Sequence, residues 1–186
     1  MHEIYSTKAF IFFSKIKSDS NEEIILFTED FGLLKIEAIS SKKQNSKHSS
    51  IIQDLSFTEV FLVPTKKSFR LTGGRLIENL CFDKEIKFKV KKIKILKNIT
   101  ILLQNIFILN NADKKIFDLL EKLFFSMKDS NSEKNIQLKE LYFLKNLFSH
   151  LGYLNIENFN NLENKSSSEI QILTKTINNQ IQKVVF

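Results

Sequence analysis

Five short apolar segments follow one another in the first 80 residues, separated by polar or glycine-containing stretches. They are rich in β-branched and aromatic residues, and several alternate between apolar and polar side chains, as strands with one buried face do. The sequence therefore predicts strands at residues 9–16, 23–28, 33–39, 56–63 and 68–78. Five short strands in close succession favour a compact β-barrel at the N-terminal end.

Glycine and proline mark the ends and irregularities of these strands. Residues 29–32 predict a tight hairpin connection in which Gly32 supplies a positive φ. Pro64 ends the fourth strand because proline donates no ladder hydrogen bond. Gly73 and Gly74 lie inside the fifth segment and predict a bulge or a close backbone approach. No Gly-Lys-Ser/Thr follows them, so a phosphate-binding glycine loop is excluded.

From residue 83 the apolar spacing changes to three and four, the period of a helix. Residues 86–90 also alternate as a strand would, but the helical period continues for over twenty residues and favours a helix. Further helices are predicted at 114–127, 137–151 and 168–185, with Gly152 at a C-cap position. The stripe expected to be buried on the first helix is Ile86, Val90, Ile93, Leu96, Thr100, Leu103 and Phe107.

The predicted fold class is therefore α+β. Residues 1–80 form a five-stranded β domain, and residues 81–186 form an all-α helical domain. Residues 128–135 and 155–168 are polar and are expected to be loops.

Positive charge is concentrated at the junction of these two regions. The 186-residue chain has a formal net charge of +7, and residues 83–99 carry seven lysines against Asp83 and Glu85. Such a patch indicates an acidic partner, such as nucleic acid or an acidic peptide, although general solubility is an alternative explanation. Lys87, Lys91 and Lys94 share one face of the predicted helix and are either part of a binding surface or only its solvated side.

A second basic group lies between the third and fourth predicted strands. Residues 40–50 contain no acidic and no large apolar residue, and they carry three lysines. A cationic loop at the rim of a small barrel is typical of single-strand nucleic-acid binding. Only two of the 28 basic residues are arginines, which favours backbone contacts over base readout. The candidate nucleic-acid-binding residues are Lys42, Lys43, Lys47, Arg70, Arg75, Lys87, Lys91 and Lys94.

Aromatic residues in the strands are candidates for stacking on bases. Phe57, Phe61 and Phe69 would stack if they faced outward, whereas burial in the barrel is the more common role of such residues.

The sequence offers no catalytic or metal-binding motif. Cys81 is the only cysteine, which excludes an internal disulfide and a cysteine-rich zinc site. The three histidines are scattered, and no serine lies in a nucleophile-elbow motif. We expect neither an enzyme nor a bound cofactor or metal. The chain also lacks a signal-peptide pattern and a membrane-spanning apolar run, so a cytoplasmic protein is expected.

Several blocks of the chain resemble the RecO family of bacterial recombination mediators. Residues 24–36 (IILFTEDFGLLKI) are similar to that family's strand–turn–strand, and residues 41–47 lie where it has a basic loop. Residues 55–62 and 71–78 resemble the strands that complete its barrel, and residues 141–153 resemble a helix that the family ends in "LLGY". The likeness is best over residues 7–80 and 137–153.

This resemblance implies an N-terminal OB-fold and a C-terminal helical domain. It implies binding of single- and double-stranded DNA, annealing of complementary strands in recombinational DNA repair, and action with RecR and single-strand-binding protein. Association with the nucleoid follows. Many relatives carry a four-cysteine zinc module after the "GY" helix, but residues 155–168 contain no cysteine. The helical domain is also short, so partner binding carries over less securely than DNA binding.

Two other functions remain open from the sequence. The chain is either a protein-interaction adaptor whose basic helix binds an acidic peptide, or an RNA-binding protein, since an OB barrel does not select the sugar by its fold alone.

Overall fold

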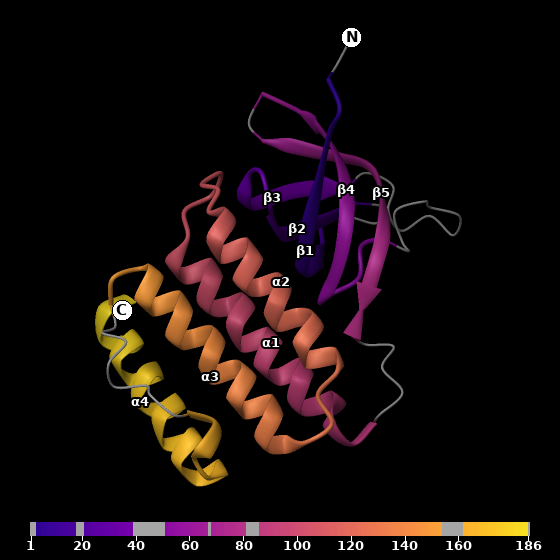
Figure 1. The fold of residues 1–186 in the computed structure, drawn as a ribbon. Helices are drawn as coiled ribbons and strands as arrows, with labels where there is room; N and C mark the ends of the chain where they lie inside the picture. The colour runs from indigo at the N-terminus through magenta and orange to yellow at the C-terminus, as the bar shows by residue number, and fades with distance from the viewer. Residues whose placement is uncertain are drawn as a thin grey trace. The chain divides into compact units, whose positions relative to one another are not determined.

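The computed structural model describes residues 3–17, 21–38, 51–66, 68–80, 86–153 and 162–185. Within them, five strands precede four α-helices, so the chain is α+β (Figure 1). The predicted strands and helices are confirmed, with ends that differ by four residues at most. The elements are β1 (Tyr5–Ile16), β2 (Glu22–Thr28), β3 (Gly32–Ala38), β4 (Ser56–Pro64), β5 (Phe69–Asn79), α1 (Ile86–Ile106), α2 (Lys114–Lys128), α3 (Glu133–His150), η3 (Leu162–Asn164) and α4 (Ser167–Val185).

The chain forms two compact units. Unit 1 comprises Met1–Lys84 together with Leu96–Phe117, and unit 2 comprises Glu85–Ile95 together with Asp118–Phe186. Helices α1 and α2 thus contribute to both units. Unit 1 therefore contains helical residues as well as the strands, an association that the hydrophobic pattern alone does not indicate.

The strands of unit 1 form a closed sheet in the order β1-β2-β3-β5-β4. The long strand β1 pairs with β4 through its first part and with β2 through its second part, and a bulge lies between Ile11 and Phe13. All pairings are antiparallel except that of β3 with β5, where Glu37 and Arg70 form a parallel bridge. The sheet is thus closed between β3 and β5 by this one bridge, whereas the other pairings are extensive.

The predicted irregularity at Gly73 and Gly74 is confirmed. The register of β4 with β5 shifts between Phe61 and Leu62, next to Gly73. A Cβ at Gly74 would lie 3.3 Å from Cα of Val60 and closer still to the carbonyl oxygen of Glu59. Glycine is therefore required at position 74, where the β5 backbone lies too close to the β4 backbone for a side chain.

Alternation places one set of apolar side chains inside the sheet. Phe31 and Phe69 pack against this core, and the ring of Tyr5 contacts both, with centroids 5.5 Å and 6.3 Å away. The strand sequences thus fill a small barrel interior with aliphatic side chains and close it with aromatic ones. The buried cluster is Ala9, Ile11, Ile24, Leu26, Leu34, Ile36, Ala38, Ile52, Val60, Leu62 and Leu71.

A second, aromatic cluster is buried on the outer side of the sheet within unit 1. Phe10, Phe27 and Phe57 point away from the aliphatic core, yet each is at most 4 % exposed. Phe117 covers them, with ring centroids 5.4 Å, 6.4 Å and 6.3 Å away respectively. Phe107 contacts Phe27 at 5.6 Å. These contacts explain why residues 96–117 belong to the same unit as the strands.

The turn between β2 and β3 packs on residues 110–112 of the same unit. Gly32 has a φ of +67°, as the hairpin prediction requires. The Asn110 N–H donates to the Leu33 carbonyl at 2.9 Å, and Lys114 pairs with Glu29 at 3.0 Å. These contacts fix the hairpin from outside the sheet.

In unit 2, capping interactions set the ends of two helices. Ser132 caps α3 by accepting from the Asn135 N–H at 3.2 Å, which explains why α3 begins earlier than predicted. At the other end, the Tyr153 N–H donates to the Phe148 carbonyl at 2.8 Å and the Gly152 N–H to the Ser149 carbonyl at 3.2 Å. With Gly152 at a φ of +80°, this is a Schellman motif, and the predicted C-cap is confirmed.

Helix α4 packs against α3 and begins with a capping box. The Ser166 N–H donates to the Glu169 carboxylate at 2.7 Å, and the Glu169 N–H donates back to the Ser166 hydroxyl at 3.3 Å. The hydrogen bonds from Ser166 lower the pKa of Glu169. Among the α4 side chains that the structure describes, Ile170 and Ile177 are buried.

The predicted buried stripe of α1 is wrong at its N-terminal end. Val90 is 74 % exposed, whereas Lys92 is only 2 % exposed. The Lys92 ammonium donates to the carbonyl of Lys128, in the last turn of α2, at 3.3 Å. A lysine stem is as long and apolar as a core side chain, and a helix C-terminus attracts its charge. Among the helices that the structure describes, none is long and apolar enough to cross a membrane.

Candidate nucleic-acid interface

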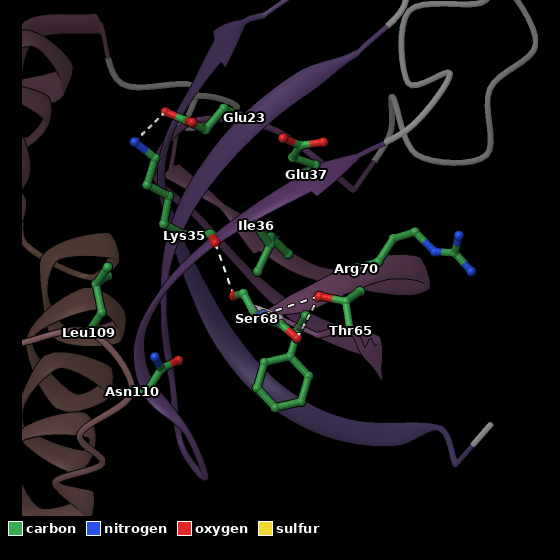
Figure 2. A pocket seen from close by; sticks show the side chains of 10 residues that line it. Glu23, Lys35, Ile36, Glu37, Thr65, Ser68, Arg70, Leu109 and Asn110 are labelled. Atoms are coloured by element: carbon green, nitrogen blue, oxygen red, sulfur yellow. Dashed lines mark hydrogen bonds and ion pairs between the residues drawn. The ribbon is translucent and has the colours of Figure 1, made fainter.

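A groove of about 520 Å³ lies in unit 1 beside strands β2, β3 and β5. Its walls come from residues of β2 and β3, from the β4–β5 connection with the start of β5, and from the segment that follows α1 (Figure 2). The lining residues are Glu23, Lys35, Ile36, Glu37, Thr65, Ser68, Phe69, Arg70, Leu109 and Asn110.

Hydrogen bonds hold the β4–β5 connection in place at this groove. The Thr65 N–H donates to the Ser68 carbonyl at 2.8 Å, and the Ser68 N–H donates to the Thr65 hydroxyl at 3.1 Å. The Ser68 hydroxyl in turn donates to the backbone carbonyl of Lys35 at 3.2 Å (Figure 2). One wall is therefore pre-organised, which lowers the entropic cost of binding a ligand.

The groove carries both signs of charge. Lys35 pairs with Glu23 at 3.0 Å, and Lys17 pairs with Glu37. The hydrogen bond and charge of Glu37 raise the pKa of Lys17, which stays cationic at neutral pH. Exposed pairs of this kind contribute at most about 1 kcal/mol, so a phosphate can replace the carboxylate partner at small cost.

The two predicted arginines of the strands differ in their surroundings. Arg75 pairs with Glu59 at 3.1 Å and keeps 73 % of its side chain exposed. Arg70 extends away from the other labelled residues of the groove in Figure 2, and within the described part of the chain no carboxylate pairs with it. Arg70 is thus a cation at the groove whose guanidinium is open to a ligand.

The three residues predicted to stack on bases differ in their burial and contacts. Phe57 is 2 % exposed and stacks on Phe10, with centroids 4.5 Å apart. Phe69 contacts Phe31 at 4.7 Å and closes the barrel interior. Only Phe61 points outward and is exposed, at 36 %.

The lysines at the start of α1 make different contacts within unit 2. Lys91 pairs with Glu133, and Lys92 donates to α2 as described above. Lys94 is exposed. Residue Lys87 lies in α1, but its side chain falls outside the described residues. The expected lysine face is therefore partly used in holding the helices of this unit together.

Lys139 of α3 also donates to the Ser126 carbonyl in the last turn of α2 and to the Ser130 hydroxyl just beyond that helix. Burial lowers the pKa of Lys139; Asp129 opposes this shift and Lys92 adds to it. Two ammonium groups thus satisfy carbonyls at one helix C-terminus, a stabilising arrangement for the helix dipole.

Burial raises the pKa of Glu140 above its ordinary value of 4.5, while the charge of Lys91 acts in the opposite direction. Its ionisation at neutral pH therefore opposes folding. We expect Glu140→Gln to increase the free energy of unfolding at pH 7. This advantage should shrink as the pH falls through the raised pKa toward 4.5, since protonation then removes the cost from the native protein.

Urea denaturation at pH 7 and at pH 4.5 measures this difference. Glu163→Gln, at an exposed carboxylate, is the matched control and should change little. A loss of stability for Glu140→Gln at pH 7 would mean that attraction to Lys91 outweighs burial.

The lysine loop cannot be placed in this picture, since Lys42, Lys43 and Lys47 lie outside the described residues. The groove residues Glu23, Lys35 and Ser68 were not among the sequence candidates. A usable signal existed for Lys35, which alternates with buried neighbours in β3 and must face outward. In the described part of the chain, no three acidic, histidine or cysteine side chains come together as a metal site would require.

No family model matches this chain, and a search of curated proteins also found no match. The fold class and the chemistry of the groove are therefore the basis for any functional assignment.

Proposed function

We propose that this protein binds single-stranded nucleic acid on an OB-fold barrel. The observation that carries the proposal is the strand order β1-β2-β3-β5-β4 with a groove beside β2, β3 and the β4–β5 connection. OB barrels bind oligonucleotides at this face and at this connection. The groove therefore lies where an OB-fold with this strand order would bind an oligonucleotide.

The groove chemistry supports a polymeric, phosphate-bearing ligand. Arg70 offers a guanidinium fork, Lys35 and Lys17 are held by exchangeable exposed pairs, and the Thr65 and Ser68 hydroxyls lie alongside. Leu109 adds an apolar surface at the edge. Such a mixture suits a sugar–phosphate backbone with bases that need little sequence readout.

We further propose that the ligand is DNA and that the protein acts as a RecO-like annealing factor of recombinational repair at the nucleoid, with RecR and single-strand-binding protein as partners. The blocks of resemblance and the basic loop at residues 40–50 support this step. Annealing requires weak, backbone-directed contacts that leave base edges free, and a lysine-rich surface provides such contacts.

Replacing Lys42, Lys43 and Lys47 with alanine should weaken binding to single-stranded DNA. Binding with fewer phosphate contacts releases fewer counterions from the DNA. The slope of log affinity against log salt should therefore become shallower by about two units. Fluorescence anisotropy of a labelled oligonucleotide over a series of salt concentrations measures both quantities. The matched control replaces Lys115, Lys122 and Lys175, which are exposed on α2 and α4, and should leave the slope close to that of the wild type. Equal slopes for the two triple variants would contradict the role of the loop.

A further inference from the structure

The outer face of strands β1, β4 and β5 carries an ordered grid of side chains. Because Val60 and Leu62 point into the barrel core, Glu59, Phe61 and Val63 of β4 point outward, and of these Val63 is buried, at 7 % exposure. Their paired residues on the flanking strands then define three cross-strand rows. One row is Ser6, Phe61 and Gly73; on one side of it lies the row of Val63 and Arg70, and on the other the row of Lys8, Glu59 and Arg75.

Two strand aromatics of this unit, Phe61 and Phe13, contact no described aromatic ring, whereas Tyr5, Phe10 and Phe57 each contact another ring. Phe61 is the exposed one of the two. Its neighbour across the strand pair is Gly73, and the Phe61 Cδ2 lies 3.3 Å from where a Cβ at Gly73 would be. The ring therefore lies against a residue without a side chain, and 36 % of Phe61 is exposed.

Both arginines of the chain lie in the rows that flank Phe61. Arg70 is paired in register with Val63, and Arg75 with Glu59. Residues two apart along a strand are separated by about 7 Å, so the backbone positions of the two arginines lie on either side of Phe61, at a distance that an arginine side chain can span. With Lys8, these three rows carry three cations, and Glu59 is their carboxylate.

We propose that this face is a second contact surface for single-stranded nucleic acid, with a base stacked on Phe61 and flanking phosphates on Arg70 and Arg75. The inference rests on the proposed function, because Arg70 also lines the β2–β3 groove and joins the two surfaces. A strand bound in the groove continues past Arg70 onto this face. Arginine provides a bidentate phosphate contact that lysine does not, which gives a role to the two arginines of a lysine-rich chain.

The ion pair of Arg75 with Glu59 regulates this surface. Glu59 also accepts a hydrogen bond from the Ser6 hydroxyl at 3.0 Å, so the carboxylate is held in place between β1 and β5. A phosphate competes with Glu59 for Arg75. Glu59→Gln should therefore tighten binding severalfold.

The test compares Phe61→Leu, Phe61→Tyr and wild type by anisotropy on two oligonucleotides of about 16 nucleotides, the upper end of OB-fold site sizes. One is oligo(dT), and the other is an abasic backbone of equal length. Phe61→Leu should bind oligo(dT) about tenfold more weakly, since one stacked base is lost. It should bind the abasic strand as the wild type does, and Phe61→Tyr should match the wild type on both.

The possible outcomes separate the two proposals. If Phe61→Leu and wild type bind oligo(dT) equally, the stacking surface is overturned while the proposed function stands. An equal loss on both strands also overturns stacking, because it shows a structural effect of the substitution. If wild type binds neither strand, both proposals fail.

Discussion

Gly32→Ala is expected to destabilise the protein by about 2–5 kcal/mol. A non-glycine residue at a φ of +67° costs roughly 1–2 kcal/mol, and forcing a methyl group into a filled space costs roughly 1–3 kcal/mol more. The new Cβ would lie 2.8 Å from the backbone nitrogen of Ala112 and closer still to the Asn111 carbonyl. Backbone atoms cannot rotate away as a side chain can. Equilibrium unfolding in urea measures the loss.

Gly152→Ala separates the two causes. Gly152 also has a positive φ, at +80°, but beyond its chain neighbours no atom of the described residues lies within 4 Å of its hypothetical Cβ. It should therefore lose only the conformational part, roughly 1–2 kcal/mol. If both variants lose the same amount, the packing of the β2–β3 turn against residues 110–112 does not contribute to stability.

Phe117→Ala should cost about 3–5 kcal/mol, the usual range for removing a buried phenylalanine ring. Phe117 is completely buried and contacts Phe10, Phe27 and Phe57 at once. Its loss would leave a cavity between the barrel and the helical residues of unit 1. Urea denaturation followed by circular dichroism measures the change in unfolding free energy.

Phe61→Ala is the matched control, with the same atoms removed from an exposed position. Surface substitutions usually stay within about 0.5 kcal/mol, and losing contact with Gly73 adds little to that. A similar loss for both variants would show that Phe117 does not join residues 96–117 to the strands.

Strand positions were predictable from the sequence because alternation reports directly on which face is buried. In β3, Lys35 and Glu37 are exposed while Leu34, Ile36 and Ala38 are buried, as the alternation predicts. The bulge at Gly73 and the turn at Gly32 were also predictable, since both depend on the missing Cβ. These are local effects, and the local sequence determines them.

The helix α1 shows where this reasoning stops. Its apolar residues lie on more than one face of the helix. The spacing of apolar residues alone does not show which face packs against another element. Tertiary contacts decided: the carbonyls at the end of α2 favour Lys92 inside, and Val90 is left exposed. The role of residues 96–117 beside the strands depends in the same way on long-range aromatic contacts.

The candidate site was only partly accessible from sequence. Arg70 and Arg75 were chosen for their charge, but their relation to Phe61 depends on strand register across a bulge. The Gly152-Tyr153 ending, one of the blocks of family resemblance, is a Schellman motif with its ring contact to Phe148 at 6.3 Å. Helix termination alone accounts for that block, so residues 24–36, 55–62 and 71–78 carry more of the likeness.

The most direct measurement is the affinity of the full-length protein for single-stranded DNA, duplex DNA and RNA of equal length over a series of salt concentrations. We predict binding to single-stranded DNA that weakens linearly on a plot of log affinity against log salt, with a slope of at least about 2, equivalent to three or more phosphate contacts. Competition by an acidic peptide of equal charge should be weak. Preference for RNA would redirect the proposal to that ligand. No salt-dependent binding to any of the three, together with tight binding of the peptide, would contradict a nucleic-acid-binding barrel.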